Sequence, residues 1–299
     1  MHTGLVYALL AFGSWGLFPL YFALVAQVPP LEVVLHRSVW SLLLVLGVLA
    51  WQRRWAWLGE TLRQPKRVAL FATSALLLAS NWLVYVMAVQ TGHVAEASLG
   101  YFINPLVNVL LGVLVLHERL RPLQWLSVAV AAAGVLWLTW QGGRLPWIAL
   151  VLAGSFGVYG LLRKIAPLGA LEGLALENLL LAPLAVPVLL WWSFLHDGVL
   201  ATGPGSLIAL LLLSGPLTAL PLLWFAGAAR RLKLATLGLV QYIAPTLQLM
   251  LAVWVFHEPF DSVRLVGFVM IWSALALVSA DALGWRPGVR RPVDAVPPG

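Results

Sequence analysis

The sequence has no cysteine and very little charge. Only 10% of its 299 residues are Asp, Glu, Lys or Arg, whereas about 25% is usual in soluble domains. The lack of cysteine excludes disulfides, thiolate metal ligands and cysteine nucleophiles. The motifs G-x-x-x-x-G-K-S/T, H-E-x-x-H and G-x-S-x-G are also missing, and the four aspartates have no metal-binding spacing. We therefore expect no enzymatic activity, no catalytic residue, no metal site and no cofactor.

What the chain has instead is apolar surface. Hydrophobic residues make up 62% of the sequence, and the mean hydropathy is +0.94. A bilayer can accept so many apolar side chains, but the surface of a soluble domain cannot. The net charge of +7 would suggest nucleic acid only if it formed a basic face on a soluble fold. Here the basic residues lie between apolar runs, so we expect lipid and no nucleic acid as a partner.

The apolar runs predict an all-α integral membrane protein with ten transmembrane helices. About 20 apolar residues cross the hydrocarbon core as a helix, whereas open strands would leave backbone groups unpaired there. The N-terminus lacks the pattern of a cleaved signal peptide, so the first run is expected to be retained as a span. The predicted spans are 4–25, 31–51, 68–90, 95–116, 123–140, 147–164, 172–195, 205–228, 234–256 and 262–282.

The basic residues predict which way these spans face. All Lys and Arg residues except Arg37, Arg144 and Arg264 fall on one side of the predicted membrane. Cytoplasmic loops are the ones enriched in Lys and Arg. This predicts a multi-pass protein of a bacterial-type inner membrane with both termini in the cytoplasm. Residues 52–67 are expected to form an interfacial stretch, and residues 284–299 a disordered, Pro-rich cytoplasmic tail.

The sequence also repeats itself with a shift of about 140 residues. Five matches occur in the same order in both halves: GSWG at 13–16 with GSFG at 154–157, Leu31-Glu32 with Leu171-Glu172, ASLG at 97–100 with ATLG at 235–238, Pro105 with Pro245, and His117-Glu118 with His257-Glu258. We therefore predict two five-helix repeats, 1–141 and 142–283. An odd number of spans inverts the second repeat, which is the arrangement behind alternating access in many transporters. A duplication without transport activity is the alternative.

Several of these strings resemble a known family. EASLGYFINPLVNVLLGVLVLHERL, HRSVWSLLL, NWLVYVMAV and ATLGLVQYIAPTLQLMLAVWVFHE are similar to the RarD branch of the EamA family, in the drug/metabolite transporter superfamily. The resemblance covers essentially the whole chain. It implies two EamA repeats, ten helices, both termini inside, and movement of small metabolites through a central cavity. It implies no catalytic residues.

Polar and aromatic residues inside the spans are the candidates for a substrate cavity. Polar side chains are unfavourable in hydrocarbon and so are expected to face the bundle interior or water. For each of them a role as interhelical glue is the alternative. Pro105 and Pro245 are expected to break their helices beside these residues. The cavity candidates are Trp15, Asn81, Tyr85, Asn104, Asn108, Tyr159, Gln241, Tyr242 and Gln248.

Four charged residues are candidates for gates. Arg37 and Glu96 are both expected near the outer face, where they could form an ion pair. The repeat places Glu177 and Lys233 near the inner face with the signs exchanged. Each pair would break as its side opens. Two alternatives are open: Arg37 could hold helices together or reach toward water permanently, or it could receive a substrate carboxylate directly.

The expected function is a secondary transporter of a small metabolite, such as an amino acid or a drug-like compound. The alternative is a non-transporting membrane protein, such as an assembly factor or sensor, that keeps the transporter fold. Glu96, Glu177 and His36 are the embedded titratable groups that would make proton coupling feasible, and uniport is equally open. The sequence does not specify the substrate or the direction of transport.

Overall fold

The computed structural model describes residues 2–116, 122–143, 145–195, 198–229, 231 and 240–282, and every regular element within them is a helix. Ten helices are long. Two short helices lie in the connections between them. The elements are α1 (His2–Leu24), α2 (Pro30–Trp51), α3 (Ala56–Leu62), α4 (Pro65–Gln90), α5 (Val94–Leu116), α6 (Pro122–Gly142), α7 (Trp147–Ile165), α8 (Ala170–Leu195), α9 (Val199–Thr202), α10 (Gly205–Ala229), α12 (Ile243–Trp254) and α13 (Ser262–Ala282).

A helix lies within each of the ten predicted spans. The bounds differ by a few residues, except that α12 covers only part of the predicted span 234–256, because residues 232–239 lie outside the described part. The short helix α3 falls within the stretch 52–67 that we expected at the membrane interface. The predicted tail, 284–299, lies outside the described residues.

The helices have the surface of a membrane protein. Five of them, α1, α2, α4, α8 and α10, are long and apolar enough to cross a bilayer, and four further helices contain shorter apolar stretches. Large apolar side chains such as Leu43, Leu76 and Leu114 are exposed along the helices. Trp51 and Trp140, at the ends of α2 and α6, are more than four-fifths exposed, as is typical of indoles at a membrane interface.

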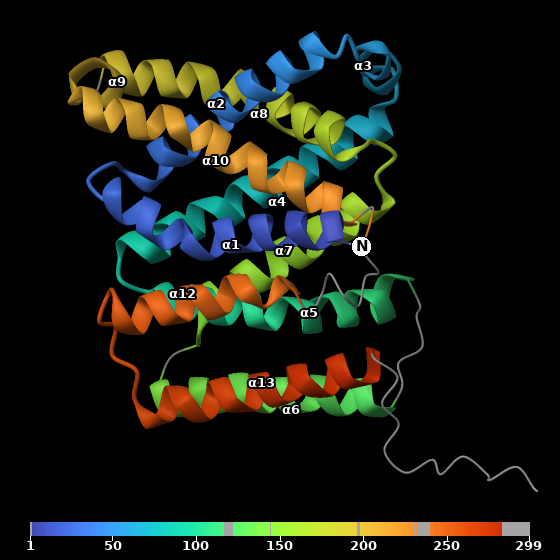
Figure 1. Cartoon of the computed structure of the whole chain (residues 1–299), viewed down its shortest axis with the longest axis vertical. Coiled ribbons are helices and arrows are strands. Elements are labelled where there is room, and N and C mark those ends of the chain that lie inside the picture. Colours follow the sequence, from blue (N-terminus) through green and yellow to red (C-terminus); the bar gives the residue numbers. More distant parts are fainter. Residues whose placement is uncertain are drawn as a thin grey trace, which may run out of the picture.

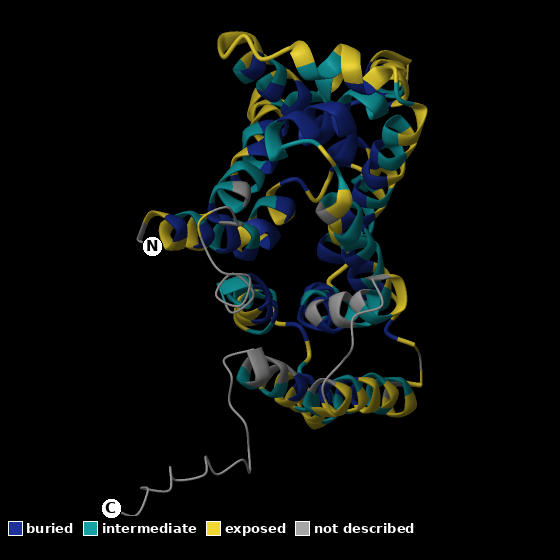
Figure 2. Cartoon of the chain, turned by 90° about the vertical axis from the view of Figure 1, so that its right-hand side faces the viewer, coloured by how far each residue is buried: buried dark blue, intermediate teal, exposed yellow. Residues whose placement is uncertain are grey.

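The helices pack in stacked pairs (Figure 1). The α6–α13 pair lies at one side of the molecule, and exposed residues run along its outer surface (Figure 2). Next to this pair lie α5 and α12, which contact each other. Then α5 packs on α7 and α12 packs on α1. Beyond them, α4 contacts α7 and α8, while α10 contacts α1 and α2, and α2 packs against α8.

The bundle has two ends. The α2–α4 connection carries Arg53, Arg54, Arg63, Lys66 and Arg67, and α1 begins at the same end, on the right in Figure 1. We call this the basic end. The opposite end consists of the connections at 25–29, 91–93, 145–146, 198–204 (which includes α9) and 255–261.

Prolines mark helix starts in this fold more than helix breaks. Pro30 and Pro65 occupy the first turns of α2 and α4, where the missing N–H would have no intrahelical partner. Pro245 lies in the first turn of α12, which begins at Ile243 after a turn residue at Tyr242. Pro105 does not break α5, which continues from Val94 to Leu116. Proline removes one backbone hydrogen bond, but the helix assignment is continuous past it, so the break expected at Pro105 was wrong.

Candidate functional site

A cavity of about 190 Å³ lies in the middle of the bundle. Seven helices contribute to its wall: α1, α2, α4, α5, α7, α10 and α12. Helical spacing explains the grouping, since lining residues on α4 are three or four apart and therefore share one face. The lining residues are Phe12, Trp15, Phe18, Arg37, Leu78, Asn81, Trp82, Tyr85, Tyr101, Asn104, Phe156, Gly160, Thr218, Leu222, Phe225, Gln241, Ala244, Pro245 and Gln248.

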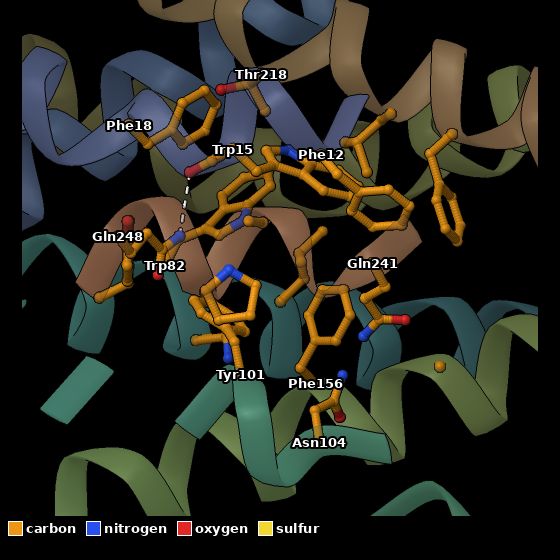
Figure 3. A pocket seen from close by; sticks show the side chains of 18 of the residues that line it. Phe12, Trp15, Phe18, Trp82, Tyr101, Asn104, Phe156, Thr218, Gln241 and Gln248 are labelled. Atoms are coloured by element: carbon orange, nitrogen blue, oxygen red, sulfur yellow. Dashed lines mark hydrogen bonds between the residues drawn. The ribbon is translucent and has the colours of Figure 1, made fainter. Parts of the chain in front are cut away.

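Eight of the 19 lining residues are aromatic. Phe12, Trp15 and Phe225 contact one another, with ring centroids 5.5–5.9 Å apart. On the other side, Tyr101 stands 5.6 Å from Tyr85 and 6.1 Å from Phe156. Figure 3 shows labelled side chains from these two groups projecting toward the same space. Such surfaces favour a ligand with an aromatic or apolar body.

Arg37 is the one basic residue among the lining side chains. It is 97% buried, since only 3% of its surface is exposed. Its Nε donates a hydrogen bond of 3.0 Å to Thr218 Oγ1 on α10. Its guanidinium carbon lies 4.5 Å from the centroid of the Trp82 ring, and the rings of Phe22 and Phe18 lie at 5.1 and 5.6 Å. Cation–π contacts of this kind favour the charge, but Nη1 has no hydrogen-bond partner.

The amide side chains tie helices together and also leave polar atoms free. Asn81 Nδ2 donates to Leu152 O (3.1 Å) and Ser155 Oγ (2.9 Å), and Tyr101 OH donates to Asn81 Oδ1 (3.3 Å). Gln248 Nε2 donates to Trp15 O at 3.1 Å, the dashed line in Figure 3. Three buried acceptors or hydroxyls of the lining have no partner: Tyr85 OH, Asn104 Oδ1 and Gln248 Oε1. These amide and hydroxyl side chains therefore both hold helices together and leave unpartnered polar atoms at the cavity.

The structure brings six of the nine predicted cavity residues together around this space: Trp15, Asn81, Tyr85, Asn104, Gln241 and Gln248. Pro245 also lines it. Tyr159 does not line it, because it is buried behind Phe156, at 5.7 Å between ring centroids. Tyr242 packs against the core instead. The side chains of Asn108 and Pro105 lie outside the described residues.

The ion pair predicted between Arg37 and Glu96 is not formed in this structure. Glu96, in the first turn of α5, accepts a hydrogen bond of 3.1 Å from Ile148 N. This places its charge at the N-terminus of α7, where the helix dipole favours an anion. Arg37 lies seven residues into α2, about 10 Å along the axis at 1.5 Å per residue. The Arg37 side chain lies in the wall of the cavity and not at the opposite end of the bundle.

Only Glu177 of the second predicted gate pair can be described, because Lys233 lies outside the described residues. Glu177 is buried and accepts a hydrogen bond of 2.5 Å from Ser74 Oγ. Its Oε1 also lies 3.7 Å from Arg163 Nη1. The cation beside Glu177 is therefore Arg163 of α7, which the sequence had placed only among the basic residues of the cytoplasmic side.

Several lining residues were missed from the sequence, chiefly aromatics that a search for polar residues passes over: Phe12, Phe18, Trp82, Tyr101, Phe156 and Phe225. The repeat contained a usable signal for two of them. Phe156 matches Trp15 at a shift of 141, and Phe225 matches Tyr85 at a shift of 140. Nothing in the sequence pointed to Thr218, because its counterpart in the repeat is the apolar Leu78. In the structure, Thr218 is positioned at the cavity by its hydrogen bond with Arg37.

Comparison with known proteins identifies the fold and the family. The model of the EamA-like transporter family matches residues 2–140. A crystal structure of a protein that is 21% identical superimposes with a TM-score of 0.62 over 96% of this chain and 99% of its own, which supports the fold alone. The chain is 49% identical over 297 residues to an uncharacterized transporter of Pseudomonas aeruginosa, covering 98% of this chain and 97% of the relative.

Several relatives carry the RarD name. Protein RarD of Streptomyces exfoliatus is 44% identical, over 99% of this chain and 94% of its own length. Protein RarD of Escherichia coli is 42% identical, over 94% and 95%. The match extends over nearly the full length in each case, and together with the apolar helices it identifies a multi-pass membrane transporter, not an enzyme. The chain belongs to the RarD branch of the EamA transporter family.

Proposed function

We propose that this protein is a secondary transporter that moves a small organic molecule across a bacterial inner membrane by alternating access. The observation that carries the proposal is the central cavity, because its wall is shared between the two predicted repeats. Helices α1, α2, α4 and α5 contribute from residues 1–141, and α7, α10 and α12 contribute from residues 142–283. A site between two halves is where a rocking motion would change its access from one side of the membrane to the other.

The helix packing supports the two inverted repeats. Helix α1 packs on α10 and α12, and α7, its counterpart in the repeat, packs on α4 and α5, the counterparts of those two. The glycines agree with this symmetry. A side-chain carbon at Gly16 would lie 2.7 Å from the Leu247 side chain, and one at Gly157 would lie 2.6 Å from Val107. Gly157 is the counterpart of Gly16 at a shift of 141 residues, and Leu247 is the counterpart of Val107 at a shift of 140. The family model, which matches residues 2–140, also has about the length of one repeat.

We propose further that this structure represents the form that is closed at the opposite end. Several hydrogen bonds join the halves there, among them those from Val199 N to Glu32 (2.8 Å) and from Ile148 N to Glu96 (3.1 Å). The carboxylate of Glu258, in the turn after α12, accepts hydrogen bonds from Val94 N (2.5 Å) and Ala95 N (2.9 Å) at the start of α5. Tyr21 OH of α1 donates to Leu210 O of α10 at 3.0 Å. With both termini in the cytoplasm, as the distribution of basic residues predicts, the opposite end would face outward.

The coupling ion is a separate question. Of the three titratable groups considered, Glu96 is held at the start of α7 and His36 accepts a hydrogen bond of 2.9 Å from Trp40 Nε1. Glu177 Oε2 has no hydrogen-bond partner although it is buried, and the other ring nitrogen of His36, Nε2, also has none but lies 3.8 Å from Glu32 Oε1. We therefore propose Glu177 as the group to examine for proton coupling, with Ser74, Arg163 and Tyr159 as the groups that interact with it.

The test is flux in proteoliposomes containing the purified protein, with a broad panel of labelled metabolites and counterflow as the readout. We expect saturable counterflow for at least one compound, and its loss on Asn81→Leu. An imposed pH gradient then separates proton coupling from uniport. Empty liposomes and liposomes with Gln141→Leu, an exposed position on α6, are the controls. Inert proteoliposomes across the panel would favour the alternative of a non-transporting membrane protein.

A further inference from the structure

Arg37 carries a positive charge inside the cavity without a carboxylate to balance it. Among the residues that the structure describes, no acidic side chain lies within ion-pair distance of its guanidinium group. The buried and half-buried carboxylates of the described helices each have another partner. Glu32 accepts from Val199 N, Glu96 from Ile148 N, Glu172 pairs with Arg54, and Glu177 binds Ser74.

A charge in this position calls for a reason. Ionisable side chains within membrane-spanning helices are unfavourable and usually mark a substrate or ion pathway. If Arg37 only held α2 against α10, we would expect the hydrogen bond from Nε to Thr218 to be accompanied by hydrogen bonds from the other guanidinium nitrogens. Instead Nη1 is buried and unpartnered. The aromatic rings of Phe18, Phe22 and Trp82 stabilise the cation through cation–π contacts, but they have no lone pair that could accept a hydrogen bond from Nη1.

We propose that Arg37 binds the carboxylate of the transported substrate, and that the substrate is a small organic monoanion with an aromatic or branched apolar body. This inference rests on the proposed function, because it assumes that the central cavity is the transport site. The planar guanidinium fork matches the two oxygens of a carboxylate. Within the described lining Arg37 is the only basic side chain, so one negative charge is balanced and a doubly charged phosphate is not.

The rest of the cavity suits the apolar part of such a molecule. Tyr85 stands close to the anion site, since its ring lies 5.7 Å from Phe22, which also contacts Arg37. Its free hydroxyl can donate a second hydrogen bond to the carboxylate. Trp15, Phe156 and Phe225 provide ring faces for the body of the ligand. A volume of about 190 Å³ admits one ring-sized group, because cavities of about 150 Å³ bind benzene.

The test compares carboxylates with neutral compounds of the same shape. The purified protein in detergent is titrated with benzoate and benzamide, indole-3-acetate and indole-3-acetamide, and phenylacetate and phenylacetamide, with thermal shift and calorimetry as readouts. We expect the wild-type protein to bind the carboxylate of a pair and not the amide. In Arg37→Gln we expect affinity for the carboxylate to fall about 10- to 100-fold, the loss typical of one charge-assisted hydrogen-bonded contact.

Two further variants separate binding from folding. Thr218→Val keeps the charge of Arg37 but removes its hydrogen bond, and should weaken carboxylate binding less than Arg37→Gln does. Arg231→Gln is the matched control, because Arg231 also stacks on an aromatic ring, Tyr7 at 5.3 Å, but outside the cavity. We expect carboxylate binding by Arg231→Gln to equal that of the wild type.

The outcomes of this experiment and of the flux assay are independent. A wild-type protein that shows no carboxylate-dependent binding overturns the assignment of Arg37, whether or not the variants fold. Equal loss of binding in Arg231→Gln also overturns it. Counterflow of a neutral compound that persists in Arg37→Gln would leave the transporter proposal intact while removing this inference. Carboxylate binding without any flux would keep Arg37 as an anion-binding residue but would overturn both the transporter proposal and the claim that the bound carboxylate is a transported substrate.

Discussion

The side-chain amide of Gln248 donates a hydrogen bond of 3.1 Å to the main-chain carbonyl oxygen of Trp15, 233 residues away in the sequence. This bond joins α12 to α1 at the wall of the cavity (Figure 3), and the oxygen of the same amide remains without a partner. The residue therefore contributes both to packing between the predicted halves and to the surface that a ligand meets.

Gln248→Leu tests that double role. The substitution keeps the approximate volume but removes the free acceptor and the bond to Trp15. We expect flux to fall about 5- to 10-fold, as for the loss of one hydrogen bond to a ligand, while the melting temperature changes by only a few degrees. Proteoliposome counterflow and a thermal unfolding curve measure the two effects. Unchanged flux with a large loss of stability would assign Gln248 to packing alone.

A second prediction concerns the two glycines of the motif at 13–16. A side-chain carbon at Gly16 would lie 2.7 and 2.8 Å from atoms of Leu247, whereas at Gly13 it would meet nothing within 4 Å. We expect Gly16→Ala to destabilise the protein by about 1–3 kcal/mol through overpacking between α1 and α12. Gly13→Ala is the matched control and should leave unfolding in detergent unchanged. Equal effects of the two substitutions would contradict the close packing seen here.

Glu258 gives a prediction that depends on pH. Burial raises the pKa of its carboxyl above the ordinary value of 4.5, against the opposing effect of hydrogen bonds from Ala95 and Val94 and of the nearby charges of Arg264 and His93. The folded protein then holds this proton more tightly than the unfolded chain does. Stability from this group is therefore present below pH 4.5 and is lost as the pH rises through the raised pKa.

The measurement compares wild type with Glu258→Gln, which does not titrate. We expect the melting temperature of the wild type, relative to the variant, to decrease between about pH 4 and pH 7. If the difference grew toward neutral pH instead, the ionised carboxylate at the start of α5 would be the favoured form, and its pKa would be lowered. His93→Gln serves as a control for titration of the neighbouring imidazole.

The orientation in the membrane can be tested by labelling, because the chain contains no cysteine that must first be removed. Thr91→Cys is placed in an exposed turn at the opposite end, and Arg63→Cys in the exposed α3–α4 connection at the basic end. With both termini in the cytoplasm, an impermeant maleimide should label Thr91→Cys in intact cells, and Arg63→Cys only after the membrane is opened. The reverse pattern would invert the proposed topology.

The sequence by itself determined the helices and the family. Long apolar runs can satisfy their backbone groups in a bilayer only as helices, and so each predicted span contains a helix. Spacing along a helix also determined which residues share a face, and for this reason Asn81 and Tyr85, four residues apart on α4, were found as cavity lining. These features depend on neighbours within a few turns of the same helix.

Only the tertiary structure decided which partner each buried charge has. Arg37 and Glu96 occupy compatible positions along their helices, yet the rotation and tilt of α2 bring Arg37 to Thr218 and the cavity, while Glu96 reaches the start of α7. In the same way Glu177 meets Arg163 and Ser74 from two other helices. Depth along a helix follows from counting residues, but direction around it follows from packing against several helices at once, and the partners of a buried charge depend on that direction.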